Sequence, residues 1–89
     1  MSADAIPETV TVVYYALLRD RAGRDRESLS VTAGATVRTL YQALSARYDF
    51  ELPEDRLQVA VNEEFVARER ELQPGDEVVF IPPVAGGAR

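Results

Sequence analysis

Residues 9–17 of the chain read TVTVVYYAL, a run of β-branched and aromatic residues that predicts a β-strand. Successive side chains of a strand point to opposite faces. We expect the core-facing side to carry Val10, Val12, Tyr14 and Ala16. The other side carries Thr11 and is assigned outward, which makes Val13 and Tyr15 candidate exposed apolar residues.

A charged turn and a second strand are predicted to follow. Residues 18–27 interleave arginines with acidic residues around Gly23, a pattern that favours a solvated turn over an anion site. Residues 28–31, SLSV, alternate between polar and apolar and are expected to pair with the first strand as a hairpin. The first half of the chain therefore begins with two neighbouring strands.

One main helix is predicted over residues 36–48, because apolar residues recur there at helical spacing. Its buried stripe is expected to contain Val37, Leu40, Tyr41, Leu44 and Tyr48. Thr36 is the expected N-cap residue. Thr39, and not Glu or Gln, stands three residues later, so no capping box is expected.

The remainder of the chain predicts three further strands. Residues 57–62 and 65–67 form two of them around a turn, and Pro74-Gly75 forms a turn before the last strand at 77–81. The inward residues are expected to be Leu57, Val59, Val61, Val78 and Phe80, and the outward apolar residues Val79 and Ile81. Pro82-Pro83 ends the last strand, because proline cannot donate to a sheet ladder.

The order of these elements indicates an α+β fold, in which one main helix packs across a mixed sheet. This arrangement suits a β-grasp (ubiquitin-like) domain over residues 1–83, followed by a flexible Gly-Gly tail at 84–89 that carries two extra residues. The first and last strands would lie side by side at the centre. Their outward residues, with Phe65 beside them, would form an exposed apolar surface of the kind that binds partners.

The composition excludes several classes of function. The 89 residues include no His, Cys, Trp or Lys, so Cys/His metal cages, thiolate nucleophiles and Ser-His arrangements are ruled out within the chain. The net charge of −5 argues against a nucleic-acid partner. No apolar run of membrane-spanning length and no signal peptide is seen, which makes the cytoplasm the expected location. We expect no catalytic machinery, no metal and no bound cofactor.

Five blocks of sequence, in this order and spacing, carry a resemblance to a known family. They are YYALLR at 14–19, GATV at 34–37, AVNEEFV at 60–66, LQPGDEV at 72–78 and IPPVAGG at 81–87. Each block is weak alone, but together they make the chain, over roughly residues 9–87, resemble the small subunits of molybdopterin synthases. These are ubiquitin-like sulfur carriers of molybdenum cofactor biosynthesis.

The resemblance implies a chemical role for the C-terminal tail. In that family an E1-like enzyme uses ATP and magnesium to adenylate the terminal glycine carboxylate, and sulfur then displaces AMP to leave a thiocarboxylate. The matching carboxylate here is that of Gly87, preceded by Gly86, Ala85 and Val84. Family members normally end at the second glycine, whereas Ala88-Arg89 follow here, so a tail-trimming protease is expected to remove them.

The resemblance also implies a protein partner, the large subunit of molybdopterin synthase. The positions that match its docking residues are Tyr15, Phe65 and Ile81. The competing interpretation of Phe65 is that it belongs to the core of a small domain. Three functions remain open: the molybdopterin synthase carrier, a carrier of another pathway (thiamine, cysteine or tRNA thiolation) or ubiquitin-like modifier, and a β-grasp interaction module without a carrier role.

Overall fold

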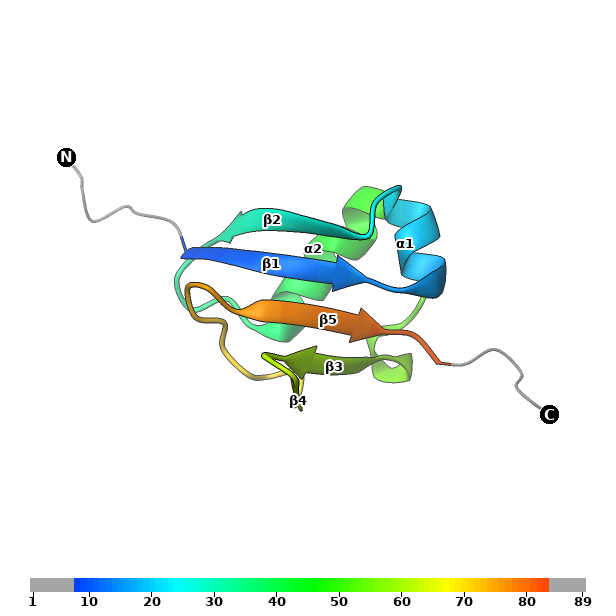
Figure 1. Ribbon diagram of the computed structural model, residues 1–89. Coiled ribbons are helices and arrows are strands. Elements are labelled where there is room, and N and C mark those ends of the chain that lie inside the picture. Colours follow the sequence, from blue (N-terminus) through cyan, green and yellow to red (C-terminus); the bar gives the residue numbers. More distant parts are fainter. Residues whose placement is uncertain (1–7, 84–89) are drawn as a thin grey trace.

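The first and last strands of the chain lie side by side at the centre of one sheet and run parallel. The computed structural model describes residues 8–83 and has five strands in the order β2-β1-β5-β3-β4. The strands are β1 (Glu8–Tyr14), β2 (Arg26–Val31), β3 (Gln58–Val61), β4 (Glu64–Phe65) and β5 (Glu77–Ile81). Helix α2 (Val37–Tyr48) crosses one face of this sheet (Figure 1), which confirms the predicted β-grasp architecture.

The core lies between the sheet and α2, as the alternation of the strands predicts. Its members from β1, β5 and α2 are Val10, Val12, Tyr14, Val78, Phe80, Val37, Leu40, Tyr41 and Leu44, all buried. Phe50 is fully buried and follows α2. The centre of the Tyr41 ring lies 5.7 Å from that of Phe50, on which it stacks, and 5.2 Å from that of Phe80 at a tilt of 59°, so aromatic contacts join the helix to the central strand.

The predicted end of the first strand and the turn that follows it are wrong. β1 ends at Tyr14, and α1 (Ala16–Ala22) occupies the region assigned to the strand end and the charged turn. Ala16 is exposed with φ 52°, not inward on a strand. Leu18 and Ala22, one helical turn apart, are buried, and Gly23 ends the helix in the left-handed region with φ 76°. Ala, Leu and Arg are strong helix formers, and their packing outweighs the β-propensity of the preceding tyrosine.

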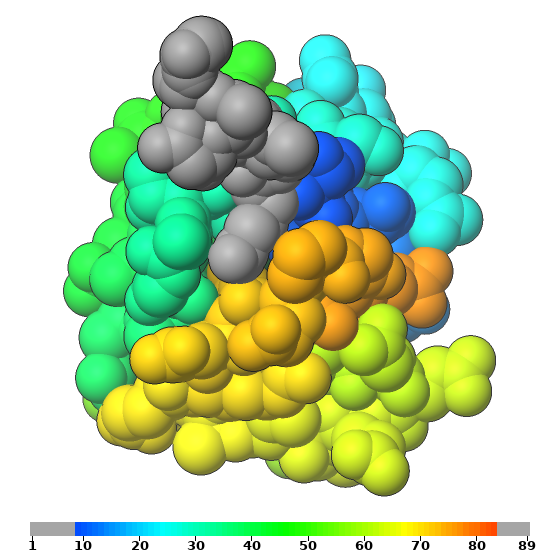
Figure 2. All heavy atoms as spheres, turned by 90° about the vertical axis from the view of Figure 1, so that its left-hand side faces the viewer, coloured from blue at the N-terminus to red at the C-terminus, as the bar shows by residue number. Residues whose placement is uncertain are grey.

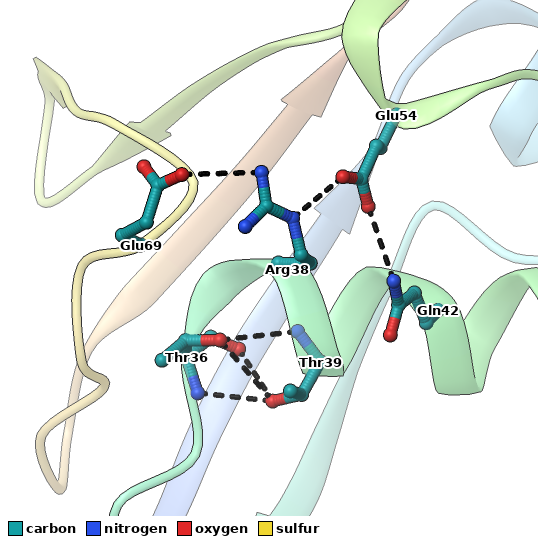
Figure 3. A network of polar contacts seen from close by, with 6 residues as sticks. All are labelled: Thr36, Arg38, Thr39, Gln42, Glu54 and Glu69. Carbon is teal, nitrogen blue, oxygen red and sulfur yellow. Dashed lines mark hydrogen bonds and ion pairs between the residues drawn. The ribbon is translucent and has the colours of Figure 1, made fainter.

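The start of α2 corrects a second prediction, because a capping box does form (Figure 3). The Thr36 hydroxyl accepts a hydrogen bond from the Thr39 backbone N–H at 3.2 Å. The Thr39 hydroxyl oxygen in turn accepts from the Thr36 backbone N–H at 2.9 Å. The Thr39 hydroxyl oxygen therefore accepts the hydrogen bond that a Glu carboxylate or a Gln amide oxygen usually accepts at this position.

Two further backbone donors at the start of α2 are satisfied by a segment far along the chain. Val37 N–H donates to the carbonyl of Arg70 at 3.0 Å, and Arg38 N–H donates to that of Arg68 at 2.9 Å. In Figure 2 the yellow segment between β4 and β5 lies against the teal segment that precedes α2. The Arg38 guanidinium also pairs with Glu54 and Glu69 (Figure 3). The long β4–β5 connection is thus tied to the helix.

A buried carboxylate organises the turn that leads into β5. Asp76 accepts hydrogen bonds from the Gln73 backbone N–H at 2.8 Å, from Asn62 Nδ2 at 2.9 Å and from Arg70 Nη1 at 2.9 Å. Burial acts to raise the pKa of the Asp76 carboxyl, but these three donors outweigh it and hold the pKa below its usual value. Asp76 therefore joins the β3–β4 turn, the β4–β5 connection and the start of β5.

The helices of residues 8–83 can be compared with the requirements for a membrane span. Within residues 8–83, none of them combines the length and the apolar character that a membrane crossing requires.

We predict that Asp76→Asn lowers the free energy of unfolding by about 2 kcal/mol at pH 7, because donors are left without their ionised acceptor. Since the native pKa lies below the unfolded value of about 3.9, the stabilisation by Asp76 is complete above that pH and is lost as the pH falls through the native pKa. Urea denaturation between pH 7 and pH 2 measures both effects. The exposed Asp55→Asn is the control, and equal losses in the two variants would contradict the role of Asp76.

Candidate functional site

A tight hairpin between β3 and β4 positions the most exposed large apolar residue of residues 8–83. The two residues of the turn, Asn62 and Glu63, have φ of 52° and 73°, the combination that a two-residue hairpin turn requires. This turn pairs Ala60 with Phe65. The side chain of Phe65 is 71% exposed, so the interpretation of Phe65 as a core residue is wrong.

Phe65 continues a cross-strand row on the sheet face opposite α2. The register pairs Ala60 with Val79 of β5, and Val79 in turn with Val13 of β1. Val13 and Val79 are half-buried, as expected for residues that face away from the core, and the small Ala60 between Phe65 and Val79 is buried. We call Val13, Ala60, Phe65, Val79 and Ile81 the outer face.

Tyr15 extends the outer face beside Ile81, at the end of the central strands. Tyr14 pairs with Phe80 in the parallel ladder, so Tyr15 and Ile81 are the next residue of each strand path. Tyr15 is 50% exposed, although it stands at the start of α1 and not within the strand. Leu17 of α1 is also exposed, at 41%, and was not singled out by the sequence because residue 17 was assigned to a strand.

Two neighbouring hollows connect the outer face with the end of β5. One, of about 330 Å³, is lined by Arg56, Gln58, Ile81, Pro82 and Pro83. The other, of about 220 Å³, includes Gln58 and Phe65. Gln58 lines both, so the two hollows are neighbours. The predicted tail residues Val84, Ala85, Gly86 and Gly87 lie outside the described residues.

An ion pair forms the polar border of the outer face on the β2 side. Arg26 of β2 reaches Glu77 of β5 at 2.8 Å, although β1 lies between these two strands. The pair therefore crosses over β1 on the outer side of the sheet. Both side chains are about half exposed and accessible to a partner, and such a charged rim around an apolar centre is typical of protein interfaces.

Buried tyrosine hydroxyls and the Glu27 carboxylate form one cluster of ionisable groups inside the fold. The Glu27 carboxylate accepts hydrogen bonds from the hydroxyls of Tyr14 and Tyr48 and pairs with Arg24 at 3.0 Å. Burial and the neighbouring Glu27 raise the pKa of Tyr14 and of Tyr48, so neither phenol ionises near neutral pH. Burial likewise raises the pKa of Tyr41 to about 12.

Groups of metal-ligating side chains can be searched for in the described part of the chain. Within residues 8–83, no three His, Cys, Asp or Glu side chains come together in a group that could hold a metal ion. The outer face presents apolar side chains and a charged rim, and the strand that supplies its centre leads into two prolines. An exposed apolar surface with a charged rim is the kind of surface that binds another protein.

Comparison with known sequences gives relatives that match over nearly their whole length. A family model described as the ThiS family matches residues 12–87. The molybdopterin synthase sulfur carrier subunit of Escherichia coli is 35% identical over 81 residues, which are 88% of this chain and 99% of that protein. The protein of the same name from Mycobacterium tuberculosis is 36% identical over 80 residues, or 88% of this chain and 96% of the relative.

Solved structures agree in fold and extend the range of relatives. A Pyrococcus furiosus structure named for molybdopterin converting factor subunit 1 has a TM-score of 0.75 at 35% identity and covers 86% of this chain and 99% of its own. SAMP1 of Haloferax volcanii has a TM-score of 0.74 at 26% identity and covers 89% and 99%. Because the sequence match spans residues 12–87 and the fold is shared, this chain belongs to the ThiS family.

Proposed function

We propose that this protein is the sulfur carrier subunit of a molybdopterin synthase. The observation that carries the proposal is the similarity, at 35% and 36% identity over nearly their full length, to two proteins of that name. The architecture supports it, because β5 runs through the centre of the apolar outer face and leads directly into Pro82-Pro83 and the Val-Ala-Gly-Gly segment. The same strand would then contribute to the surface that docks the partner and lead into the tail that enters the partner.

The proposed chemistry takes place at the carboxylate of Gly87. An E1-like activating enzyme with MgATP would transfer AMP to this carboxylate and release pyrophosphate, since a carboxylate is a poor electrophile until it is a mixed anhydride. Attack by a sulfide sulfur on the acyl carbon then breaks the acyl–oxygen bond, releases AMP and leaves a thiocarboxylate. Gly86 and Gly87 have no side chains, which allows a narrow active site to close around the backbone.

The tail must first be shortened for this chemistry to occur. Ala88 follows Gly87, so the carbonyl of Gly87 is part of a peptide bond and has no oxygen that can attack ATP. We propose that a protease removes Ala88-Arg89. Pro82 and Pro83 favour an extended backbone at the base of the tail, which limits the conformational entropy lost when the tail is inserted.

The proposed partner at the outer face is the large subunit of the synthase. Phe65 offers a rigid, exposed aromatic ring, and Ile81 and Tyr15 lie near the point where the tail leaves the sheet. Apolar side chains at the centre of a patch, surrounded by charges such as Arg26 and Glu77, are the usual anatomy of an interface. Docking here would hold the base of the tail at the entrance of the partner's active site.

A second candidate function is attachment to other proteins, favoured by the likeness to SAMP1 of Haloferax volcanii, a protein named as a small archaeal modifier. Both roles use the same activated glycine. They differ in the acceptor, which is a sulfur atom for the carrier and an amine for the modifier. Because this chain has no lysine, it offers no side-chain amine for chains of itself.

We predict that the chain ending at Arg89 is inert toward its activating enzyme, whereas a version that stops at Gly87 is adenylated. Pyrophosphate release with MgATP measures the adenylation step. After sulfide is added, mass spectrometry of the shortened chain should show the mass increase expected when sulfur replaces one carboxylate oxygen. In the shortened chain, Gly87→Ala should slow adenylation, because the added Cβ meets the active-site walls. Equal turnover of the full and shortened chains would refute the requirement for trimming.

We predict that Phe65→Ala weakens binding to the large subunit by roughly thirtyfold, which corresponds to about 2 kcal/mol for an aromatic residue at an interface centre. The melting temperature should change little, because Phe65 is 71% exposed in the free protein. Ile81→Ala should act in the same direction, and Tyr15→Ala less strongly. Calorimetric titration and thermal melts on the same samples measure both quantities.

The matched control is Gln42→Ala, an exposed residue of α2 on the opposite side of the sheet. It should leave the affinity unchanged. A large loss of stability in Phe65→Ala, with unchanged affinity of the folded fraction, would show that the docking surface lies elsewhere.

A further inference from the structure

The two edges of the sheet differ in how far they are protected against pairing with another chain. On one side the edge strand β4 has only two residues. On the other side the edge strand β2 has six, and within residues 8–83 it pairs only with β1. Edge strands are usually protected by shortness, proline, bulges or charge. β2 carries charges at its start, Arg26 and Glu27, but the rest of the strand, SLSV at 28–31, has neither charge nor proline, and its outer side faces no other strand of residues 8–83.

An apolar groove lies beside this open edge, between β2 and α2. Its volume is about 320 Å³. The apolar residues that line it are Leu29, Val31, Ala35, Leu40, Ala43 and Leu44. Leu29 and Val31 are alternate residues of β2 that face α2 and remain half-buried. Figure 1 shows β2 at the rim of the sheet with α2 behind it, so a strand added beside β2 would direct every second side chain into this groove.

The charge of the groove is opposite to that of the protein as a whole. The net charge is −5, yet the only charged residue that lines the groove is Arg47. Its guanidinium lies 5.2 Å from the centre of the Tyr48 ring, and among the ion pairs of residues 8–83 none includes Arg47, although its charge helps to lower the pKa of Glu27. The nearby Glu27 carboxylate is already engaged by Arg24 and by the Tyr48 hydroxyl. Arg47 is therefore available to an acidic group.

We propose that the β2–α2 groove binds an extended acidic–aliphatic peptide segment of a partner protein, which adds to the sheet as a sixth strand. Its backbone would pair with the free edge of β2, its alternate aliphatic side chains would fill the groove, and a carboxylate next to them would pair with Arg47. This site is at the opposite edge of the sheet from Phe65, so it leaves the outer face free and does not depend on the carrier function.

The test uses the full chain, labelled with ¹⁵N, and an end-blocked peptide of sequence Ser-Val-Ser-Ile-Ser-Val-Asp-Asp. The expected result is saturable amide shifts that concentrate in β2 and in α2 near Ala43 and Arg47. Ala43→Glu fills the groove and places a negative charge there, so it should weaken binding at least tenfold. Ala46→Glu is the matched control, because Ala46 is exposed on the same helix but does not line the groove.

The charge preference is tested separately with a peptide in which both aspartates are lysines. Arg47→Gln should weaken binding of the aspartate peptide about threefold and should not weaken binding of the lysine peptide, whose repulsion by Arg47 it removes, whereas Arg56→Gln should change neither. The proposal is overturned if no saturable shifts are seen up to about 1 mM peptide, or if the shifts centre on the outer face. It is also overturned if Ala43→Glu and Ala46→Glu weaken binding equally. Concentration-dependent self-association through β2 without peptide would assign the groove to a second copy and would also overturn it.

Discussion

The parallel ladder between β1 and β5 is the constraint on which the rest of the structure depends. It pairs Thr11 with Glu77 and Tyr14 with Phe80, residues that are far apart in the sequence. Parallel neighbours cannot be joined by a tight turn, so the chain between them must leave the sheet and return. That detour contains α2, which covers the core, and β3 and β4, which complete the other side. One pairing thus sets both the buried face and the outer face.

The same ladder explains which parts of the fold were predictable from the sequence. Side-chain alternation in β5 correctly placed Val78 and Phe80 inward, because a strand with one buried face must keep that pattern. The stripe from Val37 to Leu44 identified α2 for the equivalent reason. α1 was missed because it has only seven residues and follows two tyrosines, which favour a strand. Only two of its residues are buried, which is too few to show a helical repeat of apolar residues.

The candidate site was predictable in its members but not in its arrangement. Exposure of Tyr15 and Phe65 was expected, yet nothing in the sequence states that Phe65, Ala60 and Val79 lie in one row. That row depends on two registers: the two-residue turn at Asn62 fixes that of β3 and β4, and the long-range pairing of β3 with β5 sets the other. The ion pair over β1 was hidden for the same reason, because its two members come from strands that are not sheet neighbours.

The parallel direction of β1 and β5 has a mechanical consequence. β1 enters the shared ladder at one end, and β5 leaves it at the other, as Figure 1 shows. A force that pulls the two ends of the chain apart therefore acts along the strands in opposite directions and loads the ladder in shear. Its hydrogen bonds must then stretch together and cannot open one after another from one end. An enzyme that pulls on the end of β5 would therefore be opposed mainly by the β1–β5 pair at the centre of the sheet.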